Sequence, residues 1–206
     1  MSIRTPMRCP PKRSPFAEPV VLGLLAEAPA HGYALFARIR DDLTGVWQVG
    51  MNRLYALLDA MERDGLINGR AEQAGNRPER RVFRITAKGR RRFEAWLHAP
   101  SRSMQDMRVE FPPKLYFALR RGPQDVAALV QVQRIACRDE LERLIARLRN
   151  APPDGGYHAL VYDFRIRQVR AILDWLDACE ARCVAPTASH LTPLVKLNRP
   201  SKEKTT

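Results

Sequence analysis

The most constraining feature of the chain is a change in its hydrophobic period near residue 66. From Gly50 to Ile67 the apolar residues recur at helical spacing. In the runs Leu66 to Gln73 and Arg80 to Thr86 they alternate with polar residues, which is typical of short β-strands. The connection between the two runs, AGNRPE, contains a glycine and a proline, as turns often do. The sequence therefore predicts an amphipathic helix followed by a β-hairpin.

The predicted helix has an apolar side and a polar side. At about 100° per residue, its apolar side consists of Leu54, Leu57, Leu58 and Met61. The opposite side consists of Asn52, Ala56, Asp59 and Arg63. Arg53 and Tyr55 fall on the two flanks, and Gly65 ends the pattern. A core helix has no need of polar side chains at its start, so we expect this end to face a partner.

Two further helical segments precede this one. Apolar residues are dense from Phe16 to Ala26, and a short amphipathic helix is predicted from His31 to Leu43. His31 opens that helix, and we expect it to cap or pack rather than to catalyse. Thr86 is predicted to be the N-cap of a fourth helix after the hairpin. Three helices followed by a two-stranded hairpin is the order of a winged helix-turn-helix, which we expect in residues 16–100.

The charge of the chain favours a polyanionic partner. Lys and Arg number 35 against 22 Asp and Glu, giving a net charge of +13 and a pI near 10.3. Between Arg70 and Arg92 nine basic residues stand against two acidic ones. A DNA duplex carries one negative charge per about 1.7 Å of its axis, so a basic hairpin beside an exposed helix predicts DNA contact. Asp59 and Glu62 would repel phosphate, and we expect them to pair with Arg63 or neighbouring arginines.

The rest of the chain is predicted to be helical, and the whole fold mainly α. After the break at APSRS, Pro112 and Pro113 are predicted to begin a helix, and long helices are expected at 125–149 and 157–184. Apolar residues at alternating spacings of three and four form a seam on the last helix, like a coiled-coil edge: Val169, Ile172, Leu176, Cys179 and Cys183. We expect residues 101–184 to be a dimerisation domain, and the proline-rich basic segment 1–15 and the tail 185–206 to be disordered.

The N-terminal region, about residues 16–98, resembles the DNA-binding domain of PadR-type transcriptional regulators. The resemblance rests on PVVLGLLAEAPAHGYALFARI, NRLYALLDAMERDGLI and NRPERRVFRITAKGRRRF in this order. EFPPKLYFAL and the two long helices after it are similar to the dimerisation region of that family. The chain has Asn52 and Arg53 where Gly-Thr is usual and Ala56 where Pro is usual. These departures bear on which operator sequence is recognised and leave the expected fold unchanged.

The resemblance implies a homodimeric repressor that binds a pseudo-palindromic operator in double-stranded DNA and is often released by a small-molecule effector. Matching the motifs by position, the DNA-binding residues would be Asn52, Arg53, Tyr55, Arg77, Arg80 and Arg81. The last three lie on the wing. An alternative from another class is a winged-helix protein-interaction module that offers its basic surface to an acidic protein.

Other kinds of site are predicted to be absent. No phosphate loop, nucleophile elbow, metal-ligand constellation or paired-carboxylate motif points to an enzyme, and no cofactor is expected. Cys179 and Cys183 are interpreted as small apolar residues of the seam, with a metal or redox role as the alternative. No apolar run is long enough for a bilayer or a leader, so we expect a cytoplasmic protein without a membrane partner. Six aromatic residues line an effector cavity or belong to the plain core: Trp96, Tyr116, Phe117, Tyr162, Phe164 and Trp175.

Overall fold

The fold is mainly α, as predicted, with one small β-sheet. The computed structural model describes residues 16–43, 45–72, 80–152 and 156–184. Its elements in chain order are α1 (Ala17–Glu27), β1 (Ala30–His31), α2 (Gly32–Asp42), α3 (Met51–Arg63), β2 (Ile67–Glu72), β3 (Arg80–Ile85), α4 (Ala87–His98), α5 (Met104–Arg121), α6 (Pro123–Arg149) and α7 (Tyr157–Val184). The predicted arm 1–15, the tail 185–206 and the wing connection with Arg77 lie outside the described residues.

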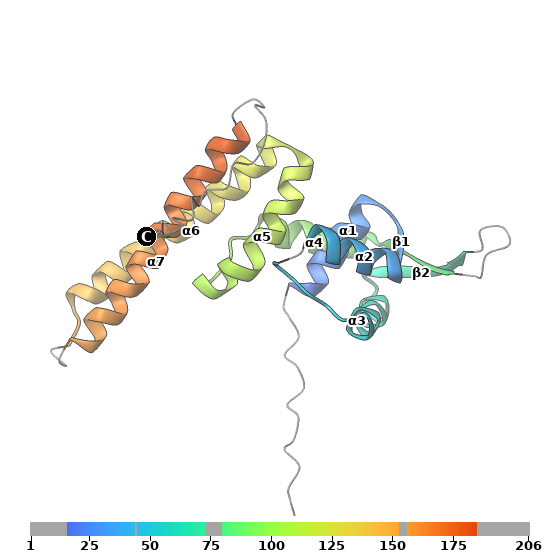
Figure 1. The fold of residues 1–206 in the computed structure, drawn as a ribbon, viewed down its shortest axis with the longest axis horizontal. Coiled ribbons are helices and arrows are strands. Elements are labelled where there is room, and N and C mark those ends of the chain that lie inside the picture. Colours follow the sequence, from blue (N-terminus) through green and yellow to red (C-terminus); the bar gives the residue numbers. More distant parts are fainter. Residues whose placement is uncertain (1–15, 44, 73–79, 153–155, 185–206) are drawn as a thin grey trace, which may run out of the picture.

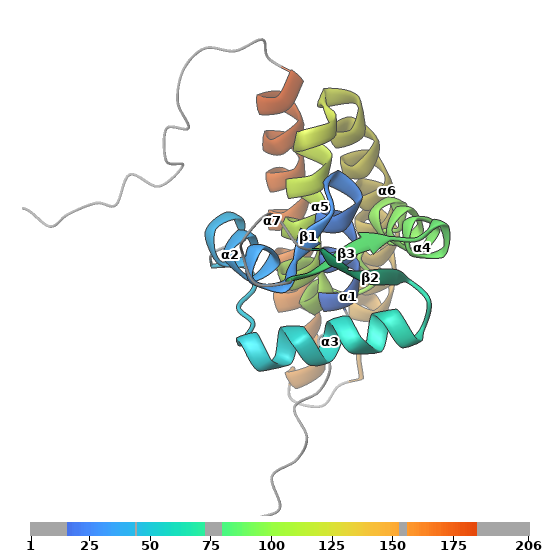
Figure 2. The same cartoon turned by 90° about the vertical axis from the view of Figure 1, so that its right-hand side faces the viewer.

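The winged helix-turn-helix elements are present in the predicted order. Helix α3 lies on the outside of the molecule, and strands β2 and β3 project beside it as the wing (Figures 1 and 2). His31 caps α2, since its Nδ1 accepts a hydrogen bond from the Ala34 amide at 3.1 Å. Thr86 caps α4 in the same way through the Gly89 amide at 3.1 Å. Both side chains therefore have the local roles that the sequence indicates.

The wing belongs to a sheet of three strands rather than two. Strand β3 is the central one, in the order β1-β3-β2, and both pairings are antiparallel. The added strand β1 is only two residues long, with Ala30 opposite Phe83 and His31 opposite Val82. Two residues are too few to show a period, so the sequence pattern did not reveal this strand. Its effect is to attach the base of the wing to the start of α2.

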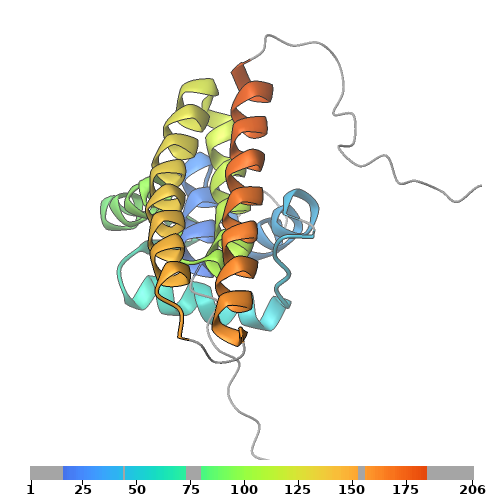
Figure 3. The same cartoon turned by 90° about the vertical axis from the view of Figure 1, so that its left-hand side faces the viewer.

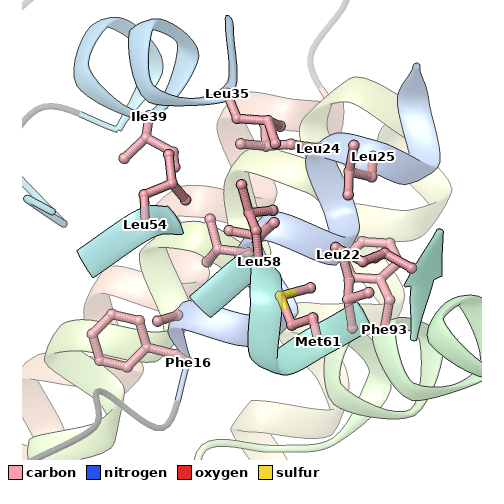
Figure 4. Packing of buried hydrophobic residues seen from close by; sticks show 14 of the residues in the cluster. Phe16, Leu22, Leu24, Leu25, Leu35, Ile39, Leu54, Leu58, Met61 and Phe93 are labelled. Carbon is pink, nitrogen blue, oxygen red and sulfur yellow. The ribbon is translucent and has the colours of Figure 1, made fainter. Parts of the chain in front are cut away.

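One hydrophobic core holds the winged region together. Leu54, Leu58 and Met61 of α3 are all at most 1% exposed. Figure 4 shows Leu58 and Met61 directed into the same interior as Leu22 and Phe93. The predicted apolar side of α3 is thus its buried side, and its polar side remains exposed. At the other end Gly65 has a φ of 67°, a left-handed conformation that glycine adopts without strain and that ends the helix.

The C-terminal helices form a second core. Helices α6 and α7 lie side by side along their length at the end of the molecule away from the wing (Figures 1 and 3). Val169 and Leu176 of the predicted seam are fully buried, and Ile172, Cys179 and Cys183 pack against the same cluster. The seam therefore packs inside the chain. A seam of this kind serves equally to join two helices of one chain or of two chains.

The predicted start of α5 at Pro112 and Pro113 is wrong, because both prolines lie inside the helix. The helix begins at Ser103, whose Oγ accepts a hydrogen bond from the Asp106 amide at 3.0 Å. Interior prolines remove backbone donors from a helix. Here Phe111 and Pro113 are buried in the core, and this packing offsets the missing hydrogen bonds.

Helix α5 belongs to both cores. Met107, Phe111 and Ala118 are part of the C-terminal cluster, whereas Phe117 is part of the winged-region cluster. The Phe117 ring stands edge-on to the Phe93 ring of α4, with centroids 5.1 Å apart. The winged region and the helical region are therefore joined through the interior and not only along the chain.

Polar contacts strengthen this junction. The Tyr116 hydroxyl donates to an Asp42 carboxylate oxygen of α2 at 2.6 Å. Arg121 donates two hydrogen bonds to Glu94 of α4, at 2.8 and 2.6 Å, in the paired geometry that arginine and carboxylate favour. This guanidinium lowers the pKa of the Glu94 carboxyl below its usual value.

The linker between α4 and α5 is also fixed. Buried Gln133 of α6 accepts a hydrogen bond from the Ser101 amide at 2.7 Å and donates to the Ser101 carbonyl at 3.3 Å. Lys114, 1% exposed, donates to the Ala99 carbonyl at 2.7 Å and lies 3.3 Å from Glu110. Burial lowers the pKa of the Lys114 ammonium. Both residues connect the linker backbone to the helical region.

Gly23 is a sensitive position at this junction. A Cβ there would lie 2.4 Å from Phe117 Cζ and 2.6 Å from Phe93 Cε2, distances at which the rings must move. We expect Gly23→Ala to lower the free energy of unfolding by about 1–3 kcal/mol, the usual cost of overpacking a core. Urea denaturation measures this change.

Gly50→Ala is the matched control, because a Cβ at Gly50 meets no atom within 4 Å. It should change stability much less. At Gly23, which lies inside α1, helix propensity alone would favour alanine over glycine by about 0.5–1 kcal/mol. A Gly23→Ala protein stabilised by that amount would contradict the close contact with Phe117.

Candidate nucleic-acid interface

The exposed face of α3 carries the polar residues that the sequence singled out. The helix starts at Gly50, whose extended backbone and carbonyl, rather than a side chain, form the cap. Asn52 and Arg53 in the first turn are exposed, and Tyr55 is 43% exposed. Because Leu54 between them is fully buried, the helix cannot turn these groups inward. The first turn of α3 therefore presents an amide, a guanidinium and a phenol to the surroundings.

Tyr55 also packs against the start of α2. A Cβ on Gly32 would lie 2.7 Å from two ring carbons of Tyr55, so the ring covers this glycine. Tyr55 therefore packs against the fold with part of its ring and is exposed over the rest. The contact limits where the Tyr55 hydroxyl can lie.

A hollow separates the first turns of α2 and α3 from the wing. Its volume is about 470 Å³, and it is lined by His31, Gly32, Tyr33, Tyr55, Arg80 and Arg81. Tyr33 was not predicted as a site residue, although it is 62% exposed. Its place two residues after His31, at the start of a predicted helix, was the signal available in the sequence. Two phenols and the Arg80 guanidinium make the hollow suitable for an anion, whereas the Arg81 guanidinium also pairs with Glu62.

The alternation predicted for the wing strands holds only near the core, because the outer residues of β2 and β3 are exposed on both faces. Phe83 is 2% exposed and points into the core, while Arg80, Arg81 and Arg84 are exposed. Arg84 forms an ion pair with Glu72 of the neighbouring strand at 2.8 Å. Arg80 and Arg81 both line the hollow that Tyr55 lines.

Arg81 has partners on α3. Its guanidinium forms an ion pair with Glu62, and Nη1 lies 3.9 Å from Asp59 Oδ1. The expectation that these two acidic residues pair with a neighbouring arginine is confirmed. Arg63 instead donates to the Asp59 backbone carbonyl at 3.3 Å.

The basic residues of α4 are partly satisfied within the chain. Lys88 Nζ donates to the Asp64 carbonyl at 2.7 Å, and Arg92 forms an ion pair with Glu18 of α1. These contacts attach α4 to the end of α3 and to α1. The positive charge between residues 70 and 92 is therefore divided between holding the domain together and facing outward.

The three cysteines that the structure describes have no feature of a reactive site. Cys137, Cys179 and Cys183 are free thiols. Burial raises the pKa of the Cys137 and Cys179 thiols, which disfavours the reactive thiolate. In the parts of the chain that the structure describes, no three His, Cys, Asp or Glu side chains are grouped so as to hold a metal ion. None of the described helices is long and apolar enough to cross a bilayer.

A second hollow, of about 390 Å³, lies beside the linker between α4 and α5. Its walls are residues 100–105 and polar side chains of α6 and α7, among them Gln133, Glu140, Arg143 and Arg165. None of the six aromatic residues interpreted as either cavity lining or plain core lines this hollow. Trp96, Tyr116 and Phe117 pack with the winged-region core, and Phe164 is 61% exposed.

Comparisons with known families match nearly the whole described chain. Residues 21–95 match the Transcriptional regulator PadR-like family, and residues 107–183 match Virulence activator alpha C-term. The first match spans α1 to α4 except for the first few residues of α1 and the last few of α4. The second covers most of α5, all of α6 and all of α7 except its last residue.

Individual proteins with recorded functions are similar at low identity. The Negative transcriptional regulator PadR of Bacillus subtilis is 24% identical over 168 residues, covering 77% of this chain and 92% of that protein. The structure of Bacillus subtilis PadR in complex with operator DNA has a TM-score of 0.42 at 21% identity, over 81% of this chain and 99% of that one. The same protein in complex with p-coumaric acid has a TM-score of 0.38 at 21% identity, over 81% and 97%. By this match, the winged helix-turn-helix region of the chain is a domain of the PadR-like family of transcriptional regulators.

Proposed function

We propose that the chain is a homodimeric repressor that binds a pseudo-palindromic operator and is released from it by a small molecule. The observation that carries the proposal is the first turn of α3, where Asn52, Arg53 and Tyr55 are exposed beside an arginine-bearing wing. The major groove of B-DNA is about 12 Å wide and admits a helix, whose first residues reach the base edges.

The proposed contacts follow from the chemistry of each side chain. Asn52 and Arg53 offer amide and guanidinium donors to base edges, and the Tyr55 hydroxyl donates to a phosphate. Arg80 on the wing, with Arg77 outside the described residues, contacts the phosphate backbone. Arg81 belongs to the same surface. The name of the Bacillus subtilis relative, a negative regulator, supports repression rather than activation.

An exposed apolar stripe on α7 supports the dimer. Tyr157, Leu160 and Phe164 are 66%, 70% and 61% exposed, and their spacing sets them on one face of the helix. Trp175, 37% exposed, continues that face two turns from the C-terminal end of α7. Exposed apolar patches of this kind mark interaction surfaces. We assign the stripe to a second copy of the chain.

The hollow beside the α4–α5 linker supports release by an effector. An occupant would touch residues 100–105, which join the two cores, and Gln133, which holds Ser101. Movement of this linker changes the position of the winged region relative to α7. In a dimer it changes the distance between the two α3 helices, which has to match about 34–36 Å between half-sites.

Arg53→Ala and Arg80→Ala separate base contact from backbone contact. We expect Arg53→Ala to reduce the preference for operator over unrelated duplex by about 1–3 kcal/mol. Arg80→Ala should weaken binding to all duplexes alike and reduce the salt slope by about 1. Fluorescence anisotropy at several salt concentrations measures both quantities. An Arg53→Ala protein with unchanged preference favours the alternative of a protein-interaction module.

Phe164→Glu tests the dimer surface. A charge on the apolar stripe opposes its burial against a second copy, so we expect the protein to become monomeric at micromolar concentration. Leu119→Glu on α5 is the matched control, because Leu119 is 53% exposed and lies outside the stripe. Analytical ultracentrifugation distinguishes the two states. If the Phe164→Glu protein remained a dimer, the stripe would not be the interface.

Ala136→Phe tests the effector hollow. Ala136 lines the hollow beside Gln133, far along the chain from α3 and the wing. A phenyl ring there occupies part of the space, so we expect unchanged operator affinity and loss of release by any compound that releases the wild-type protein. Operator release in the anisotropy assay is the measurement. Release at wild-type concentrations by the same compound would contradict the assignment.

A further inference from the structure

Glu62 of α3 contacts both strands of the wing. Its Oε1 accepts a hydrogen bond from the Gly69 amide of β2 at 2.8 Å, and its Oε2 pairs with the Arg81 guanidinium of β3. The Glu62 side chain is only 25% exposed, which is low for a carboxylate on the outer part of a helix. One carboxylate therefore links the last turn of α3 to the backbone of one strand and to a side chain of the other.

The space around Gly69 is fitted to this contact. A Cβ there would lie 2.6 Å from Arg81 Nε and 3.0 Å from both Glu62 Oε1 and Phe83 Cε1. Gly69 and Phe83 are opposite each other in the strand register. The Arg81 guanidinium also lies over the Phe83 ring, 5.5 Å from its centroid. Arg81 thus crosses a glycine, covers a buried aromatic ring and ends on a carboxylate of α3.

Arg81 differs in this respect from the other arginine pair on the wing. Arg84 pairs with Glu72 on the adjacent strand, so that contact stays within the wing and does not reach α3. Of these two ion pairs, only that of Arg81 connects the wing to the helix that carries Asn52 and Arg53. It also neutralises Glu62, a carboxylate on the helix proposed to enter a groove lined with phosphates.

We propose that Glu62, Arg81 and Gly69 form a clasp that sets the position of the wing relative to α3, and that Arg81 is a positioning residue for DNA binding rather than a phosphate contact. The inference rests on the proposed function. Helix and wing contact the same duplex only when their relative position is fixed beforehand, so loss of the clasp weakens binding without removing a contact to DNA. The Arg81 side chain is 52% exposed, so solvent screens its ion pair with Glu62 and the pair adds little to stability; the effect should appear mainly in binding.

Glu62→Gln gives opposite results under the two roles of Arg81. If Arg81 contacted phosphate, removing Glu62's negative charge would free the arginine and strengthen DNA binding. If Arg81 acts through the clasp, the same substitution weakens binding to every duplex by about three- to tenfold, the range that coupled pairs typically show. Fluorescence anisotropy against operator and unrelated duplexes measures the change, and circular dichroism melting should show an unchanged midpoint.

Glu72→Gln is the matched control. It removes the same charge from the partner of Arg84, near the tip of the described wing, without touching α3. We expect unchanged or slightly tighter binding. Tighter binding by Glu62→Gln as well would overturn the inference and leave the proposed function in place.

Gly69→Ala provides a test that alters no charge. The added methyl group displaces Arg81 from Glu62, so we expect weaker binding with the salt slope of the wild-type protein. Affinity equal to wild type in this variant would overturn the clasp. A wild-type protein that binds no duplex even at low salt would instead refute the proposed function itself, so the two failures are distinguishable.

Discussion

The rest of the structure depends on the packing of α5 into two cores at once. Phe117 packs against both Gly23 and Phe93 in the winged region, while Phe111 on the same helix packs among the C-terminal helices. The ion pairs of Arg121 and the hydrogen bond of Tyr116 hold the same junction from outside. A helix that is buried on two sides cannot move relative to one core without disturbing the other, so the two regions behave as coupled parts.

Through this coupling, α5 links the position of the winged region to that of the α6–α7 pair. The α3 helix and the wing lie at one end and the α6–α7 pair at the other, with α5 between them (Figure 1). In the proposed dimer, the two chains meet at their α7 helices. The distance between the two α3 helices is then set by how each α5 positions its winged region relative to α7. Gln133 and Lys114 fix the α4–α5 linker, and in the proposed mechanism a small displacement of this linker changes that distance.

Much of the fold could be predicted from the sequence, because its strongest signals are local. The buried and exposed sides of α3, the caps at His31 and Thr86, and the bounds of α7 follow from periodicity and capping chemistry within a few turns. The predicted start of α5 was wrong because proline usually stands at the beginning of a helix, whereas here Pro113 and the nearby Phe111 are buried within it. Strand β1 was missed because its two residues are defined only by their partners in β3.

The residues of the candidate site could be predicted from the sequence, but the contacts between them could not. Asn52, Arg53, Tyr55 and Arg80 are exposed where the helix and strand patterns put them. That Arg81 reaches Glu62 across Gly69 depends on three segments meeting in space, which no single pattern in the chain contains. The role of Arg81 in the family-based prediction, as a DNA contact, therefore becomes a positioning role in the proposal.

The central claim is that two copies of the chain present their α3 helices to one duplex at matched spacing. Selection of bound sequences from a random duplex pool, followed by measurement of the protein-to-duplex ratio, tests it most directly. The account predicts two chains per duplex and an enriched sequence with inverted half-sites about 10 base pairs apart, centre to centre. One chain per duplex, or a pool in which no inverted repeat is enriched, would contradict it.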